Sequence, residues 1–580
     1  MRKVLIAAAV VAAAAVGYYT WTSSERSVDM PELAFIPADT ALLSVQIKPI
    51  DLPTYLASVG MMPPASVSQM RADFEQARGE LAIDETPSAA FAFSLFEQFL
   101  GALEQPEHFS QITGLSDKSQ SLMYMVGVAP VMRLQVSDET KFWAMFDAAE
   151  QDSGFSHQQD TLEGQNYRRY KLVTESDSEV QIDLLVRVDA QWATLTLDSS
   201  SLAADELATR LAISQPTDNL RASNKVGKLI EQYDLHTHGV GYLSSAVIAA
   251  AFTNPESNRL GRDLVKISEG ELIADSSDWQ TPACQQDLAG ITERWPGMVF
   301  DLAIEQNAAS GVWVRSNFLI PTSDKDAIAN LQGLRGFIPS SLNGKLTEAM
   351  AYLALGSDIG QLAPNLSKLW VGIADAEYSC LPLVQMQQDM KQNNPLAALA
   401  VTAMGNGLQG AALIVNEFDL AAMQNGMGSA ALDAVVSVAA SDIQAIYNVI
   451  QASLPPLMNT PLPEVGEATD ITQTVVMLGG IPGQYYLLRG ENQLLIHSQG
   501  QAESQAKDIA GEPLTKNGIF AMGMNYEKLF SMLAKTMAAA GEEIPDELKG
   551  LMTTDMNLAF SVDVNEHGLI MTTEMQANNP

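Results

Sequence analysis

The chain of 580 residues is too long for one ordinary hydrophobic core, and this length predicts two to four domains. Hydrophobic residues make up 47% and charged residues 18%, which is typical of a globular protein and excludes a disordered or fibrous one. With 33 basic and 69 acidic residues the net charge is 33 − 69 = −36, and no basic block can follow a phosphate backbone, so we expect no nucleic-acid partner.

The N-terminus carries the pattern of an export signal. Two basic residues, Arg2 and Lys3, precede an apolar run over residues 4–21. Aromatic residues at the end of the run suit the outer interface of a bilayer, which favours a signal anchor over residues 1–22 that stays in the inner membrane. Cleavage near residues 15–17 remains an open alternative. The charge distribution around the run places the rest of the chain in the periplasm of a bacterium, behind a polar tether over residues 23–34.

A first α+β unit is expected over residues 35–320. Alternating apolar residues predict its strands, and helical apolar stripes behind capping residues predict its helices. The expected strands are 41–47, 121–128, 131–136, 167–173, 180–197 and 240–243. The expected helices are 66–79, 88–103, one that follows Ser137 and Asp138, 202–213, 246–252 and 284–295.

A hairpin closes this unit and recurs at the end of the chain. Its two copies span Met298–Phe318 and Met556–Met575, with apolar residues at corresponding positions and Asn and Gly in both turns. Other pairs recur in the same order, among them Ser137-Asp138 and Ser441-Asp442 before a helix. We therefore expect a linker over residues 321–336 and a second, related unit over residues 337–577.

The expected fold class is α+β. Strands that are joined by short turns pair antiparallel. The sequence therefore predicts two tandem related units, each an antiparallel sheet with helices packed on one side, behind an N-terminal hydrophobic helix.

This layout resembles a loosely defined family of bacterial envelope proteins. The resemblance rests on Pro37-Ala38-Asp39 before the first strand, on the strand and helix over Val136–Phe146, and on the strands over Tyr167–Leu197 that precede the helix Leu202–Ile213. It covers most of residues 35–320. Since the family has no established activity, the resemblance implies an envelope location and assigns no catalytic residue.

One histidine cluster is the candidate for metal chemistry. On a strand, His236 and His238 would face the same side, and Asp234 would supply a third ligand. Surface histidines near the start of a strand are the expected interpretation, so we expect no metal site, and the metal is kept only as the alternative. The sequence shows no phosphate loop, dinucleotide fingerprint or nucleophile elbow, so we expect no cofactor. An envelope hydrolase with a metal or a cryptic carboxylate pair is kept as the alternative function.

The chain contains two cysteines, Cys284 and Cys380, one in each expected unit. Because an exported protein meets an oxidising compartment, we expect a disulfide that links the two units, with two separate buried thiols as the alternative. The duplicated units, the tether and the lack of catalytic motifs favour a non-enzymatic binding or scaffolding protein. Its partner would be a protein or lipid component of the envelope, received in an apolar, methionine-containing cleft.

Overall fold

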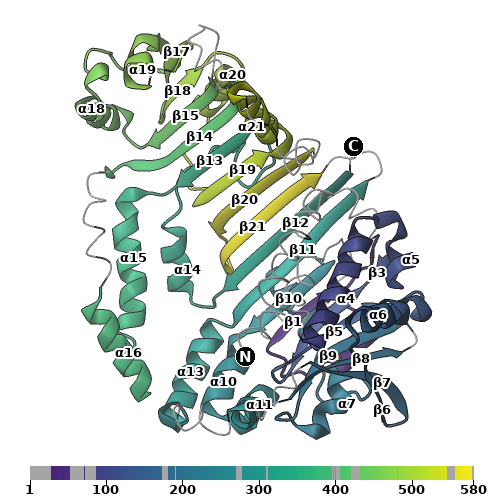
Figure 1. Ribbon diagram of the computed structural model, residues 1–580. Coiled ribbons are helices and arrows are strands. Elements are labelled where there is room, and N and C mark those ends of the chain that lie inside the picture. Colours follow the sequence, from purple (N-terminus) through teal and green to yellow (C-terminus); the bar gives the residue numbers. More distant parts are fainter. Residues whose placement is uncertain are drawn as a thin grey trace. The chain divides into compact units, whose positions relative to one another are not determined.

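In the computed structural model the chain forms two compact units (Figure 1). The first comprises the described residues up to Ser316 together with Tyr378–Val384, and the second comprises the described residues from Asn317 onward apart from that segment. The structure describes residues 28–51, 71, 86–172, 181–189, 191–268, 277–307, 311–394, 396, 399, 405–419, 432–479, 481–541, 543–544 and 555–577. The expected signal anchor over 1–22 and the expected helix over 66–79 thus lie largely outside the described residues.

The fold is mixed α+β, and within each unit the strands pair antiparallel. This agrees with the fold class expected from the alternating apolar residues. Among the helices of the described residues, none has the length and apolar character needed to cross a membrane.

The first unit is built on antiparallel strands in the order β11–β10–β1–β4–β5–β9–β8–β7–β6, and β12 forms a hairpin with β11. A separate two-stranded pair joins β2 to β3. The strands are β1 (Leu42–Gln46), β2 (Ile50–Asp51), β3 (Lys118–Ser119), β4 (Ser121–Val126), β5 (Ala129–Gln135), β6 (Gln158–Leu162), β7 (Gln165–Lys171), β8 (Ile182–Asp189), β9 (Trp192–Ser199), β10 (Gly239–Ser244), β11 (Gly297–Asn307) and β12 (Gly311–Pro321).

Several helices of the first unit begin at a residue whose side chain caps the first turn. The helices of this unit are α4 (Pro87–Leu103), α5 (Phe109–Thr113), α6 (Glu139–Ser153), α7 (Leu207–Arg210), α8 (Leu220–Ser223), α9 (Lys225–Tyr233), α10 (Ser245–Thr253), α11 (Arg259–Ile267) and α13 (Pro282–Arg294). Short 3-10 helices are η1 (Pro31–Phe35), η3 (Pro106–His108), η4 (Ala204–Glu206), η5 (Pro255–Ser257) and η6 (Ser277–Trp279).

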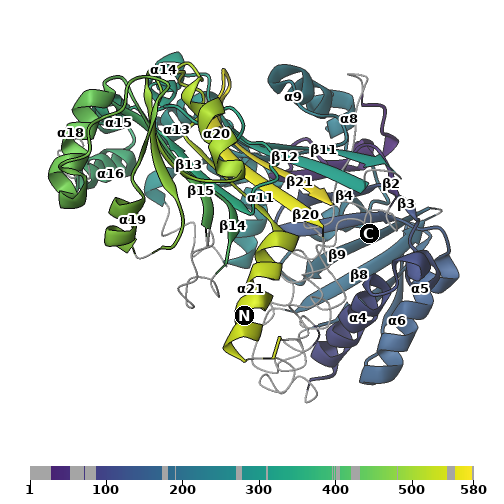
Figure 2. The same ribbon diagram turned by 90° about the horizontal axis from the view of Figure 1, so that it is seen from above.

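Helices cover both faces of the first unit's sheet, over different strands. On one face Tyr242 of β10 packs in a core with Val226 of α9. On the opposite face, Phe91 of α4 and Phe146 of α6 lie with ring centroids 4.6 Å and 5.9 Å from that of Tyr170 on β7. The helices α4 and α6 lie side by side (Figure 2). The expectation of helices on one side is therefore wrong for this unit, because both faces of the sheet are apolar.

The second unit has the strand order β21–β20–β19–β13–β14–β15–β18–β17–β16, again antiparallel throughout. Its strands are β13 (Ala351–Gly356), β14 (Leu408–Phe418), β15 (Leu432–Ala440), β16 (Ala468–Asp470), β17 (Tyr485–Arg489), β18 (Gln493–Ser498), β19 (Phe520–Asn525), β20 (Met556–Val564) and β21 (Gly568–Ala577). Its helices are α14 (Lys325–Gln332), α15 (Ile359–Ala374), α18 (Ile443–Ser453), η8 (Pro455–Leu457), α19 (Thr472–Gly479), α20 (Gln501–Ala510) and α21 (Tyr526–Ala540), while α16 (Leu381–Gln392) begins in the Tyr378–Val384 segment.

The core of the second unit lies beneath α20. Ala502, Ala506 and Ile509 of this helix are buried in one cluster with Ala354 of β13 and Val435 of β15. A second cluster lies beneath α18 and α19 at the β17–β18 end of the sheet.

The segment over residues 321–336 is not a free linker, which corrects the expectation. It contains α14, whose capping residue Asp324 accepts hydrogen bonds from the backbone N–H groups of Asp326 and Ala327, each at 3.0 Å. Arg335 then pairs with Asp563 of β20 at 2.7 Å. The cap and the ion pair hold the segment within the second unit.

Candidate functional site

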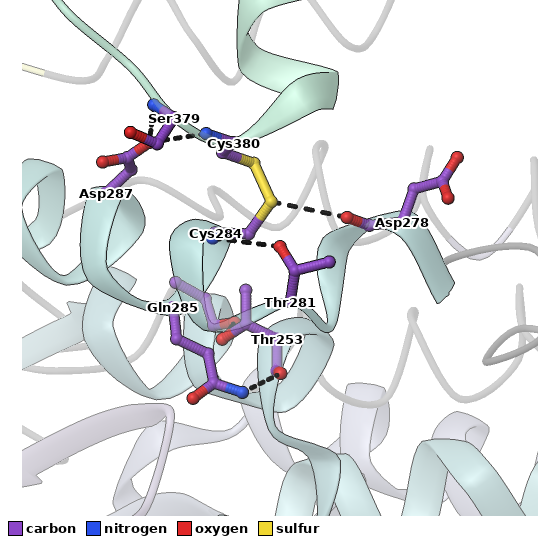
Figure 3. Close-up of a disulfide and its surroundings, with 9 residues drawn as sticks. Thr253, Asp278, Thr281, Cys284, Gln285, Asp287, Ser379 and Cys380 are labelled. Carbon is purple, nitrogen blue, oxygen red and sulfur yellow. Dashed lines mark hydrogen bonds between the residues drawn. A yellow bond between two sulfur atoms is a disulfide. The ribbon is translucent and has the colours of Figure 1, made fainter.

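Cys284 and Cys380 are joined by a disulfide whose Cα atoms are 4.4 Å apart (Figure 3). Cys284 lies in the first turn of α13, where its backbone N–H donates to the Thr281 hydroxyl at 3.3 Å. Cys380 directly precedes α16 and belongs to the Tyr378–Val384 segment of the first unit. The bond therefore lies inside the first unit rather than linking the two expected units, because the chain returns to the first unit at this point.

The surroundings of the disulfide are apolar and closed. Both sulfur-bearing residues are fully buried, in a cluster with Leu383 and the partly buried Trp279. The Asp287 carboxylate accepts from the backbone N–H groups of Ser379 at 2.6 Å and Cys380 at 2.8 Å, and it thereby caps the start of α16 (Figure 3). Burial keeps these sulfurs away from soluble thiols, which makes the bond structural rather than catalytic.

The three residues of the alternative metal site, Asp234, His236 and His238, lie in the turn between α9 and β10 and not on a strand. Asp234 ends α9 with a left-handed backbone at φ 50°. His236 is exposed, and its backbone N–H donates to the Asp301 carboxylate at 2.6 Å. His238 is only 2% exposed, and its carbonyl accepts from the N–H of Ile47 at 2.8 Å. The alternative geometry, with two histidines on one side of a strand, is therefore not formed, and of the two only His236 is a surface histidine as expected.

Burial also sets the protonation state of His238 in this turn. Burial, helped by the charges of Lys48 and His236, lowers the pKa of His238 from its ordinary value to about 2. Within the part of the chain that the structure describes, no group of three histidine, cysteine, aspartate or glutamate side chains is placed to hold a metal ion.

The second unit has an exposed apolar sheet surface, which the sequence analysis did not single out. Three rows of directly opposed residues cross strands β15, β14, β13, β19 and β20, and directly opposed side chains in an antiparallel sheet point to the same face. The rows, which we call the apolar face, are Val436–Leu413–Leu353–Met522–Phe560, Val438–Ala411–Leu355–Phe520–Val562 and Ala434–Val415–Ala351–Met524–Leu558.

The centre of the apolar face is open to solvent. The exposed fractions are 43% for Leu353, 53% for Leu355, 42% for Leu413 and 45% for Val436. No position of the three rows carries a charged side chain, whereas the reverse side of the same strands is buried under α20. Exposed apolar patches of this kind are uncommon on folded proteins and are a feature of surfaces that contact a protein or a membrane.

A sequence signal for the apolar face exists in the strands themselves. Residues 351–355, 411–415 and 434–436 are apolar at successive positions instead of alternating with polar ones. Such runs are typical of strands that are covered on both faces, so they indicate two apolar faces. Only the structure shows that helix α20 covers one face of these strands. The centre of the opposite face is exposed.

Comparisons of the chain with protein-family models, with curated proteins and with solved structures found no match. The geometry of the apolar face therefore carries the functional argument.

Proposed function

We propose that the protein is a non-enzymatic binding component of the bacterial envelope, held at the inner membrane by residues 4–21 with its body in the periplasm. The buried disulfide supports an oxidising compartment, since such bonds persist outside the cytoplasm. Arg2 and Lys3 before the apolar run support export.

The observation that carries the binding function is the apolar face. Burying a leucine side chain that is now half exposed releases about 1–2 kcal/mol, so a partner that covers Leu353, Leu355 and Leu413 together gains substantial affinity. The backbone of these strands is already hydrogen-bonded in the sheet ladders. An extended peptide laid on this face would therefore bury its own N–H and C=O groups without partners.

The partner that fits is a protein segment in an α-helix, which satisfies its own backbone and presents one apolar stripe. The chain itself uses this mode twice. Helix α20 packs on the reverse side of the same strands, and α4 and α6 pack on Tyr170 in the first unit. Because the net charge is −36, the polar side of the partner helix is neutral or basic.

We further propose that the two units arose by duplication of one domain. The strand orders support this. The first unit has the order β11–β10–β1–β4–β5–β9, and the second unit has the order β20–β19–β13–β14–β15–β18. Taken position by position, the two orders connect their strands along the chain in the same way. The Ser-Asp step supports it too. Ser137 and Ser441 each donate a backbone N–H at 2.9 Å to the carbonyl of a glycine, Gly114 and Gly407 respectively.

Photo-crosslinking in the native envelope tests the binding function. A photoreactive residue at position 355 or 413 is expected to label one helix of a partner protein at spacings of three or four residues. A probe at Val449, an equally exposed apolar residue on α18, serves as the control and should not label that helix.

The labelled segment, made as a peptide, should bind the purified protein, and Leu413→Glu should weaken it at least tenfold because a charge would be buried in the interface. Adducts with lipid only would contradict a protein partner. Equal labelling from position 449, or unchanged peptide binding by Leu413→Glu, would remove the apolar face as the site.

A further inference from the structure

Three polar side chains lie next to one another inside the first unit. Arg133 of β5 is directly opposite Thr194 of β9, and Thr194 is directly opposite Arg187 of β8. Directly opposed residues share one face of the sheet, with Cα atoms about 4.5–5.5 Å apart. All three are buried, with exposed fractions of 3%, 1% and 3% for Arg133, Thr194 and Arg187. Two buried arginines therefore flank one buried threonine on the same face of the sheet.

Several donors of this row have no protein acceptor. Arg133 Nε and Nη1, Arg187 Nε and Thr194 Oγ1 lack a hydrogen-bond partner within the described residues. Tyr124 Oη also lacks one there, and Tyr124 lies on the same face because its opposed residue on β5 is Val131, two positions from Arg133. Buried polar groups in folded proteins are almost always satisfied, so a concentration of unpartnered donors calls for a ligand.

The other neighbours of Arg133 do not meet this need. Its guanidinium lies 4.8 Å from the ring centroid of Phe35 and 5.1 Å from that of Trp192, and these rings stabilise the cation without offering a lone pair to its N–H groups. Arg187 is paired with Asp189 at 2.8 Å and with Gln165 at 3.2 Å.

The charges in the row favour a negative ligand. Burial lowers the pKa of Arg133, the nearby charge of Arg187 lowers it further, and Tyr124, Glu32 and Asp189 oppose this shift. Burial raises the pKa of Tyr124 to about 12, so its hydroxyl remains a donor at neutral pH.

We propose that this row binds one small anion, of the size of chloride or formate, between Arg133 and Arg187. The unpartnered nitrogens can only donate, and an anion accepts from all of them as well as from the hydroxyls of Thr194 and Tyr124. A water molecule fits this site less well than an anion. It would have two hydrogens to donate, and the only acceptors in the row are the hydroxyl oxygens of Thr194 and Tyr124. The near-complete burial of the row means that the ion is enclosed when the unit folds.

The test measures thermal unfolding of the full chain in sodium chloride, bromide or formate, with sodium gluconate at equal ionic strength as the reference because gluconate is too large for the site. The wild-type Tm is expected to rise with the logarithm of the small-anion concentration relative to gluconate. Arg133→Gln should abolish this dependence, and Thr194→Val, which keeps both arginines and the side-chain volume, should weaken it. Arg221→Gln is the charge-matched control at a half-exposed arginine and should retain the full dependence.

Crystals grown in sodium bromide give the second readout. An anomalous peak between the guanidinium groups of Arg133 and Arg187 would support the proposal. Water at that position, or a Tm dependence that is the same in wild type, Thr194→Val and Arg221→Gln, would overturn it. If Arg133→Gln fails to fold, Thr194→Val decides the outcome.

Discussion

Burial in the fold, more than the neighbouring residues in the sequence, sets the environment of single side chains in the first unit. His236 and His238 are two residues apart, yet one is exposed and the other is 2% exposed. Arg210 is 1% exposed and is stabilised by an ion pair with Asp198 at 2.8 Å. Neither environment follows from residue type, because both depend on which strand or helix covers the position.

We predict that His238 makes the protein less stable in acid. Its folded-state pKa of about 2 lies below the unfolded value near 6.5, so the unfolded chain binds a proton that the folded chain excludes. Stability therefore falls as the pH drops through 6.5. Between pH 7 and pH 5 the wild type should lose about 2 kcal/mol more than His238→Gln, measured by urea unfolding. Identical pH dependence of the two proteins would contradict the buried, neutral state of His238.

At the scale of elements, sequence patterns located the strands of the two hairpins, several other strands and several helices, and they missed others, among them α9, α11 and α20. The expected helix over 88–103 is α4 (Pro87–Leu103), and the expected strand over 41–47 is β1 (Leu42–Gln46). The expected helix over 202–213 is instead the short η4 and α7. It stops because Arg210 turns inward to Asp198, and Ala212 adopts a left-handed backbone at φ 51°.

We predict that the matched caps Asp138 and Asp442 stabilise their helices equally. Each carboxylate accepts from the N–H three residues on, Lys141 at 3.1 Å and Ala445 at 3.0 Å. Replacing either aspartate by alanine should cost about 1 kcal/mol, seen as faster hydrogen exchange in α6 or α18 respectively. The Asp→Asn variants keep the acceptor and serve as controls. Unchanged exchange in either helix would show that its cap is not stabilising.

At the scale of the molecule, the disulfide joins residues 96 positions apart and holds Tyr378–Val384 in the first unit. We predict that the double variant Cys284→Ala, Cys380→Ala loses about 2–4 kcal/mol of stability, because the bond closes a long loop in the unfolded chain. Hydrogen exchange should also rise in residues 378–384. The single variant Cys380→Ala should lose a similar amount. Loss of stability without faster exchange in that segment would show that other contacts hold it.

The location of the whole molecule is tested by fractionation. We predict that the full-length protein sediments with the inner membrane and is digested when protease is added to spheroplasts, because the proposed location anchors it through residues 4–21 and places the body outside. A variant that begins at residue 23 behind a cleavable signal should be soluble in the periplasm. A soluble wild-type form starting near Gly17 would show cleavage, and protection from protease would reverse the topology.

The sequence by itself determined the class of fold, the positions of many strands and several helices, and the recurrence of the terminal hairpin, because apolar periodicity and capping residues act over a few neighbours along the chain. Only the tertiary structure decided that Cys380 joins the first unit, that residues 321–336 fold, and that Arg133 and Arg187 flank Thr194. It also decided that Leu353 and Leu413 stay exposed on strands whose reverse side is buried. These outcomes depend on contacts between residues far apart in the chain, which local patterns do not encode.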